Sequence, residues 1–129
     1  MNTEPTAIRL AEKLRQLTVD GKISWKFKEL RPENRKPRDA YIAELSEEST
    51  SALIAETKVA PGVASYSLFL ASNGETFFEV FAEGYPADPS EEKFKMHAEF
   101  QALFNAARDN ARQTAQKVEE FEQLLQRLA

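Results

Sequence analysis

Apolar residues near the N-terminus recur at intervals of three and four positions, which is the spacing of one helix face. The members of this pattern are Ala7, Ile8, Ala11, Leu14 and Leu17. Thr3 precedes them and is a residue type that favours helix starts. The pattern ends at Asp20-Gly21, where glycine can supply the positive φ of a helix end. We therefore predict a helix over residues 4–18.

After Gly21 the apolar period changes from that of a helix to that of a half-buried strand. Ile23, Trp25 and Phe27 alternate with polar residues and predict the first strand. Residues 31–39 combine two prolines with polar side chains, so we expect an exposed loop there. Two further apolar runs, over residues 40–45 and 52–59, predict the second and third strands.

The dipeptide Asn73-Gly74 separates two more apolar runs, over residues 66–70 and 76–81. This dipeptide tolerates the two positive φ values of a type I′ turn, so we predict that the runs form a hairpin. The connections between the five predicted strands are too short for crossover helices. The pattern therefore indicates an antiparallel meander.

The segment after residue 88 keeps a helical apolar spacing to its end and has no proline after Pro89. Asp88 as the cap, Pro89 at the first position and Glu91 three residues after the cap predict a helix over residues 89–129. At about 1.5 Å per residue this helix would reach roughly 60 Å, twice the diameter of a small domain. Either it bends back near residues 108–110 as a helical hairpin, or it projects and buries its apolar stripe against a partner.

These elements predict one α+β domain over residues 1–129, with an N-terminal helix, a five-stranded antiparallel meander sheet and a long C-terminal helix or helical hairpin. The 129 residues, 42% hydrophobic and 29% charged, are typical of a folded chain with one core. The absence of cysteine excludes disulfides, thiolate zinc sites and cysteine nucleophiles. Neither a secretion signal nor a membrane-spanning run is recognisable, so we expect a cytoplasmic protein.

Strand parity divides the side chains between two faces of the predicted sheet. One face is apolar enough to form the core under the helices. The other face mixes apolar and charged side chains, and an exposed patch of this kind typically marks a contact site. Its apolar members are our predicted partner-binding residues, Ile42, Ile54, Phe69, Phe77 and Phe81. The alternative is that a helix covers this face as well.

Positive charge is concentrated in one segment. Between residues 22 and 38, seven cations and two acids give +5, which leaves −9 for the rest because the whole chain carries −4. The candidate polyanion-binding residues are Lys22, Lys26, Lys28, Arg31, Arg35, Lys36 and Arg38. Beside the aromatic rings of the mixed face, these cations could hold single-stranded nucleic acid. On this interpretation the chain resembles PUR-type and Whirly-type proteins, which also pair strands in a meander before a helix. The alternative is a lysine-rich edge strand that blocks aggregation.

Asp39, Glu56 and Lys58 resemble the Asp…Glu-x-Lys arrangement of the restriction-endonuclease-like superfamily, with Glu12 as a further acid. The resemblance covers about residues 4–58. It implies carboxylates that hold Mg²⁺ beside a lysine that stabilises charge on the scissile phosphate. The superfamily continues with a helix where this chain has Pro61-Gly62. A solvated Glu-Lys pair is the alternative.

His97 is the single histidine and the four glycines are isolated, so we assign no catalytic residue, metal ligand or cofactor. We predict a non-enzymatic protein–protein interaction module, a homodimer or other homo-oligomer with a protein partner. The chain is similar in size and charge to secretion chaperones, although those carry a helix between their third and fourth strands. Bacterial or phage immunity proteins and inhibitors belong to the same class of small acidic proteins. The predicted oligomerisation residues are Val118, Phe121, Leu125 and Leu128.

Overall fold

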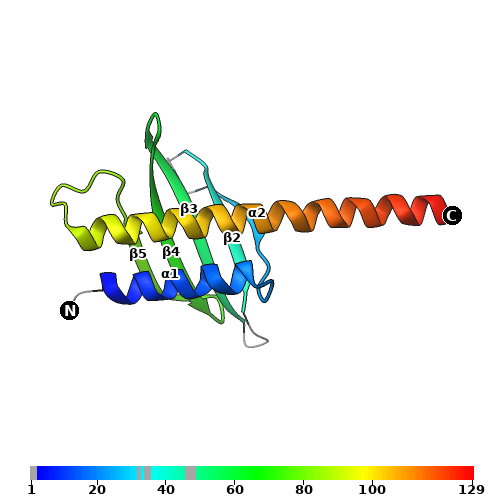
Figure 1. The fold of residues 1–129 in the computed structure, drawn as a ribbon, viewed down its shortest axis with the longest axis horizontal. Helices are drawn as coiled ribbons and strands as arrows, with labels where there is room; N and C mark the ends of the chain where they lie inside the picture. Colours follow the sequence, from blue (N-terminus) through cyan, green and yellow to red (C-terminus); the bar gives the residue numbers. More distant parts are fainter. Residues whose placement is uncertain (1–2, 32, 34–35, 46–48) are drawn as a thin grey trace.

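The computed structural model describes residues 3–31, 33, 36–45 and 49–129. Within these residues, helix α1 (Glu4–Val19) precedes a five-stranded sheet along the chain, and helix α2 (Glu91–Leu128) follows it. The strands are β1 (Lys26–Leu30), β2 (Arg38–Glu44), β3 (Thr50–Ala60), β4 (Val63–Ser72) and β5 (Glu75–Ala82). This arrangement confirms the predicted α+β fold (Figure 1).

The strands pair in chain order, and each is antiparallel to the next. Asn73 and Gly74 connect β4 to β5 with φ values of 53° and 82°, the two positive values that the predicted hairpin turn requires. Leu70 faces Phe78 whereas Ala71 faces Thr76, so Phe77 is the extra residue of a bulge. The meander and its hairpin are therefore confirmed.

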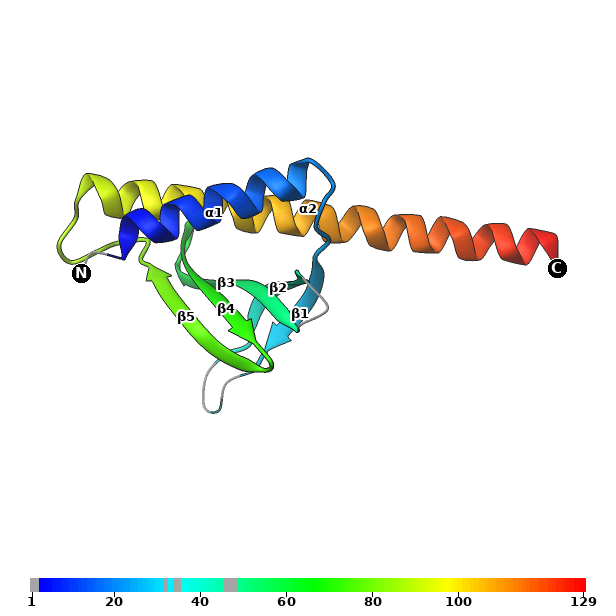
Figure 2. The same cartoon turned by 90° about the horizontal axis from the view of Figure 1, so that it is seen from below.

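The two helices lie side by side on one face of the sheet, and no other described segment covers the opposite face (Figures 1 and 2). The largest fully buried side chains lie between these layers and are Trp25, Ile54, Leu68, Phe100 and Leu103. Two hydrogen bonds fix Trp25, which precedes β1. Its Nε1 donates to Thr18 Oγ1 at 2.8 Å, and its backbone N–H donates to Asn110 Oδ1 at 2.8 Å. These bonds hold the α1–β1 connection against α2.

Helix α2 begins two residues later than the sequence predicts. Ser90, and not Asp88, is the cap, and its hydroxyl oxygen accepts a hydrogen bond from the backbone N–H of Lys93 at 3.2 Å. Ser90 has an extended backbone, with φ −144°, which aims its side chain at the first turn. The predicted range 89–129 is thus corrected to Glu91–Leu128.

Helix α2 runs without interruption through residues 108–110, so the helical-hairpin alternative is wrong. Its 38 residues correspond to a length of about 57 Å at about 1.5 Å per residue. The first part lies over the sheet, and the second part extends past the sheet edge (Figures 1 and 2). The other alternative, a projecting helix, is the one that the structure shows.

The side chains of β3 face the opposite sides of the sheet from those predicted. Ile54 pairs with Tyr41 and with Leu68 beneath the helices, and its exposed fraction is 0%. The predicted place of Ile54 on the mixed face, as a partner-binding residue, is therefore wrong. Residues 52–55 are apolar at both parities, so their alternation fits two registers, and pairing with Tyr41 decides between them.

Candidate interaction site

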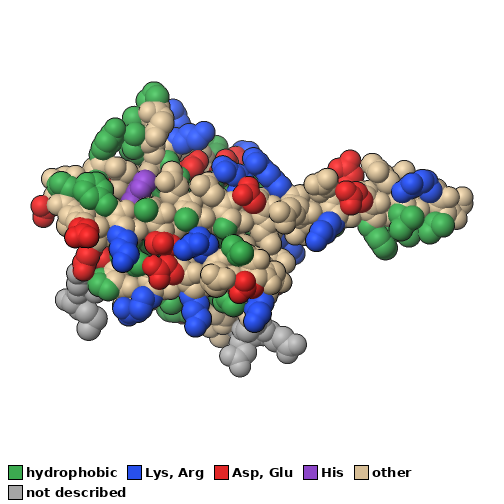
Figure 3. All heavy atoms as spheres, in the orientation of Figure 1, with side chains coloured by type: hydrophobic (Ala, Val, Ile, Leu, Met, Phe, Trp, Pro, Cys, Tyr) green, Lys and Arg blue, Asp and Glu red, His purple; other side chains and the backbone are tan. Residues whose placement is uncertain are grey.

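Residues 112–128 form the distal segment of α2, and every one of them is exposed. The exposed fractions are 53% for Val118, 60% for Phe121, 51% for Leu125 and 75% for Leu128. Hydrophobic side chains gather on one side of the end of this segment (Figure 3). The structure thus brings together all the predicted oligomerisation residues. We call this surface the distal stripe, which comprises Val118, Phe121, Leu124, Leu125 and Leu128.

Leu124, 43% exposed, is the member of the distal stripe that sequence reasoning missed. A strict alternation of three- and four-residue steps passes from Phe121 directly to Leu125. The signal that could have found it is its spacing of three residues from Phe121, which places both side chains on neighbouring positions of the helix surface.

The distal stripe continues the buried face by which α2 packs on α1 and the sheet. Phe100, Phe104 and Ala107 are buried and share the alternating three- and four-residue spacing of Val118 and Phe121. Complete burial of a Leu or Phe side chain is worth roughly 1.5–3 kcal/mol. Since the stripe residues are about half exposed, covering them would release several kilocalories per mole before the costs of association.

A hollow of about 430 Å³, the junction hollow, opens where α2 leaves the sheet. Its lining residues are Trp25, Lys26, Phe27, Tyr41, Ala111, Arg112, Thr114 and Ala115. Phe27 points to the helix side of β1, and its ring lies 5.7 Å from that of Tyr41. It is nevertheless 55% exposed, because β1 is the edge strand. Strand parity shows the side to which Phe27 points but not how completely α2 covers it.

The sheet face turned away from the helices is the open sheet face. Ile42 and Phe69 are partly buried on it, and Phe81 is 48% exposed. A hollow of about 310 Å³ lies among Lys28, Leu30, Ile42, Ser51, Leu53, Phe69, Ala71, Gly74 and Thr76. Phe77, 64% exposed, sits in the bulge beside the hairpin turn. Three of the predicted partner-binding residues therefore share the open sheet face, with Phe77 at its margin and Ile54 on the opposite side.

The structure distributes the predicted polyanion-binding cations over several places. Lys26 and Lys28 are exposed on the open side of β1, and Arg31 forms an ion pair with Glu29 at 3.2 Å. Arg35 lies outside the described residues. The remaining members are Lys22, in the turn after α1, and Lys36 and Arg38, beside a second hollow. The described cations are thus divided among the turn after α1, strand β1 and the border of the second hollow.

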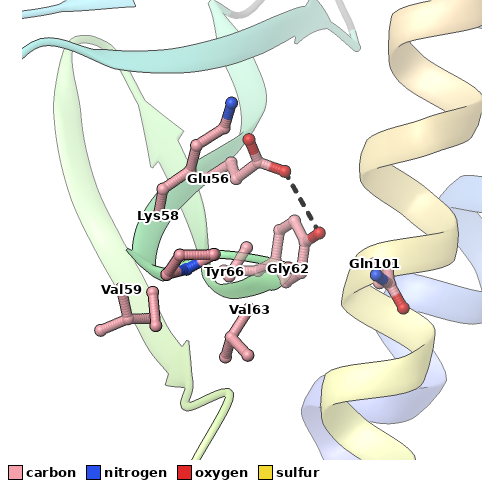
Figure 4. Close-up of a pocket in the computed structure, with 10 residues that line it drawn as sticks. Glu56, Lys58, Val59, Gly62, Val63, Tyr66 and Gln101 are labelled. Carbon is pink, nitrogen blue, oxygen red and sulfur yellow. Dashed lines mark hydrogen bonds between the residues drawn. The ribbon is translucent and has the colours of Figure 1, made fainter.

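This second hollow, of about 460 Å³, brings together the residues of the nuclease-like arrangement. We call it the carboxylate hollow, and it is lined by Lys36, Pro37, Arg38, Asp39, Glu56, Thr57 and Lys58. Glu56 and Lys58 extend from β3 and also line a neighbouring hollow with Tyr66 and Gln101, which Figure 4 draws. There Glu56 Oε2 accepts a hydrogen bond from Tyr66 Oη at 3.2 Å. Glu12, on α1, does not line it. Within the described ranges, no three histidine, aspartate or glutamate side chains are grouped to hold a metal ion.

Two tyrosines close to Glu56 have raised pKa values. Burial, and secondarily the negative charge of Glu56, raise the pKa of Tyr66. Burial likewise raises the pKa of Tyr41, against the opposing effect of the Arg112 charge. Both hydroxyls therefore remain protonated at neutral pH, and Tyr66 acts on Glu56 as a neutral hydrogen-bond donor.

His97 extends from α2 and packs against β4. Its Nε2 donates a hydrogen bond to the carbonyl oxygen of Ala64 at 2.7 Å, since a carbonyl can only accept. Its ring centroid lies 5.4 Å from that of Tyr66. The side chain thus joins the helix to the sheet.

Comparison with protein-family models, with curated proteins and with solved structures finds no match to this chain. In the part of the chain that the structure describes, no helix has the length and apolarity that crossing a membrane requires. Function must therefore be inferred from the surfaces themselves. The distal stripe and the junction hollow together expose apolar side chains of α2 and β1, among them Phe27, Phe121 and Leu128.

Proposed function

We propose that this protein is a non-enzymatic interaction module that self-associates through the distal stripe and receives a protein partner on its open sheet face. One observation carries the proposal. Val118, Phe121, Leu125 and Leu128 are at least half exposed on one side of a helix segment that extends past its own sheet. Large exposed apolar surfaces of this kind mark protein contact sites.

Helix energetics support the same conclusion. A short helical segment without tertiary contacts is marginally stable in water, because its backbone hydrogen bonds barely offset the cost of ordering the chain. Pairing with a second helix through positions spaced three and four apart removes the apolar side chains from water and stabilises the helix. The distal stripe has this spacing, so a second copy of the chain would stabilise it.

The test is the solution mass, measured by light scattering over a range of protein concentrations. Wild-type protein is expected to form a dimer of twice the chain mass of 14.6 kDa. Phe121→Asp combined with Leu125→Asp should give a folded monomer, because each substitution places a charge in the dimer contact. A matched control adds the same charges on the other side of the helix, as Gln116→Asp with Gln123→Asp, and should remain dimeric. A wild type that stays monomeric at high concentration contradicts the proposal.

The open sheet face supports the second part of the proposal, because Ile42, Phe69 and Phe81 combine there with a hollow of about 310 Å³. If this face is separate from the self-association surface, Phe81→Asp should leave both the fold and the dimer mass unchanged. Loss of the dimer in this variant would show that copies associate through the sheet, and the open face would no longer be free for a partner.

A second candidate function, binding of a polyanion such as single-stranded nucleic acid, is favoured by one observation. Lys36, Arg38 and Lys58 border the same hollow, although Asp39 and Glu56 oppose them there. A complex of this kind loses affinity with rising salt by a power that follows the number of phosphates neutralised. Absence of oligonucleotide binding at low salt would eliminate this candidate. Cleavage that needs Mg²⁺ and disappears in Glu56→Ala would favour the nuclease-like arrangement instead.

A further inference from the structure

We propose that two copies of the chain pair antiparallel, with the tip of each α2 seated in the junction hollow of the other copy. The inference rests on the proposed self-association and adds its geometry. In the register that overlaps residues 111–128 of the two copies, residue 128 of one copy lies beside residue 111 of the other. Residue 125 then lies beside residue 114, and residue 121 beside residue 118.

The packing of α1 selects this direction. Helix α1 lies along the proximal part of α2 (Figures 1 and 2), and the apolar side chains at the end of α2 turn to the side on which α1 lies (Figure 3). In a parallel pair the two stripes would face each other, and the α1 helices of both copies would compete for the space between the α2 helices. In an antiparallel pair each α1 lies beyond the end of the other copy's α2.

The sizes of the side chains fit the antiparallel direction. Small residues, Ala111 and Thr114, begin the exposed apolar face, and large residues end it. Antiparallel overlap places Leu128 of the partner copy against Ala111 and Leu125 of the partner copy against Thr114. In a parallel pair, small residues would face small residues, and Phe121 of one copy would face Phe121 of the other. Well-packed interfaces have neither such gaps nor such crowding.

The junction hollow receives the tip. Ala111, Thr114 and Phe27 line its volume of about 430 Å³, and Phe27 is 55% exposed. Leu128, 75% exposed, is the last apolar residue of the distal stripe. Antiparallel overlap brings Leu128 of the partner copy to this hollow, so that one contact covers both exposed groups.

The charges along the distal segment are divided in the same sense. Residues 111–117 carry two cations, Arg112 and Lys117, and no acid, so their net charge is +2. Residues 118–128 carry three acids and one cation, so their net charge is −2. An antiparallel pair places these oppositely charged halves side by side. A parallel pair could join Lys117 to Glu122, but an exposed ion pair contributes too little to outweigh the overlap of two α1 helices.

Cross-linking through single cysteines tests the direction, because the chain contains no cysteine of its own. Thr114→Cys and Leu125→Cys are prepared separately, one of them with a tag that changes its mass. They are oxidised alone and as a mixture. We expect a disulfide between residues 114 and 125 in the mixture and little cross-linking of either variant alone. Gln123→Cys, on the other side of the helix, serves as the control and should not cross-link.

The other outcomes separate this inference from the proposed function. Cross-linking of each variant with itself would overturn the antiparallel direction and leave self-association standing. A dimer without any cross-link would place the contact elsewhere and also overturn the inference, whereas a wild-type monomer would overturn both.

A second measurement addresses the hollow. Phe27→Ala and Leu128→Ala should each weaken the dimer by about tenfold, and the double variant by less than the product. If the effects of the two substitutions were independent, Leu128 of one copy would not contact Phe27 of the other. That result would overturn the proposed seating of the tip in the junction hollow.

Discussion

The two parts of α2 have one apolar pattern and opposite environments. In the proximal segment, residues 91–111, Phe100 and Leu103 have exposed fractions of 0%. In the distal segment Phe121 is 60% exposed and Leu125 is 51% exposed. Both segments repeat apolar residues at intervals of three and four. The pattern therefore determines which side of a helix is covered, but it does not determine what covers it.

The dimensions of the sheet explain where the environment changes. Five strands spaced about 4.8 Å apart span roughly 20 Å, and that width covers about 14 residues of a helix that crosses them. Helix α2 contacts all five strands. Its buried residues begin at Met96 and end at Ala107, with Ala111 partly buried. The sheet is too narrow for the remaining length of α2, so the distal stripe extends past it and stays exposed.

The largest expected effect comes from replacing one phenylalanine in each segment of α2. Phe100→Ala should lower the free energy of unfolding by about 3–5 kcal/mol, because it leaves a cavity among buried side chains. Phe121→Ala removes a similar ring from an exposed position and should change the unfolding of the dilute monomer by less than about 0.5 kcal/mol. Urea denaturation at low protein concentration measures both. Equal losses would show that the distal segment belongs to the monomer core.

The next effect concerns concentration. If a second copy covers the distal segment, each tenfold increase in protein concentration should raise the free energy of unfolding by about 1.4 kcal per mole of wild-type dimer. Thermal unfolding over a range of concentrations measures this as a rising midpoint. In Phe121→Asp with Leu125→Asp the midpoint should be independent of concentration. A wild-type midpoint that does not change with concentration would contradict the proposal that a second copy covers the distal segment.

Asn110 lies near the end of the proximal segment, and its substitution tests how tightly this part of α2 is held to the rest of the fold. Its Oδ1 accepts a hydrogen bond from the backbone N–H of Trp25 at 2.8 Å. Asn110→Ala should leave that donor without its partner and cost about 1–2 kcal/mol of stability. Gln116→Ala, on the exposed distal segment, is the control and should cost less than about 0.5 kcal/mol. Hydrogen exchange at Trp25 should accelerate in the first variant alone, and unchanged exchange would argue against this bond.

The element types and the hairpin follow from the sequence because each depends on local spacing or on one dipeptide. The register of β3 does not, since residues 52–55 are apolar at both parities and only pairing with Tyr41 places Ile54 inside. The distal stripe follows from spacing, whereas the junction hollow depends on where α2 crosses β1. Phe27 shows the limit, because no local pattern encodes how far a distant helix extends over it.

The smallest effect is a pH dependence beneath the proximal segment. Tyr66 is 2% exposed, its ring lies 5.5 Å from that of Phe104, and burial and the Glu56 charge raise its pKa above the ordinary value of 10.0. Above about pH 10 the unfolded chain therefore releases this proton before the folded chain does, so stability falls as pH rises. At neutral pH Tyr66→Phe should cost about 0.5–1.5 kcal/mol through loss of the hydrogen bond to Glu56.

Because a phenylalanine side chain cannot titrate, the stability difference between wild type and Tyr66→Phe should narrow as pH rises above about 10. Tyr85→Phe, at a position that is 75% exposed, is the matched control for the removal of a phenol hydroxyl. Urea titrations from about pH 7 to about pH 11 measure both differences. A Tyr66→Phe difference that stayed constant would mean that the phenol reaches water and that α2 covers this part of the sheet less tightly than its buried residues indicate.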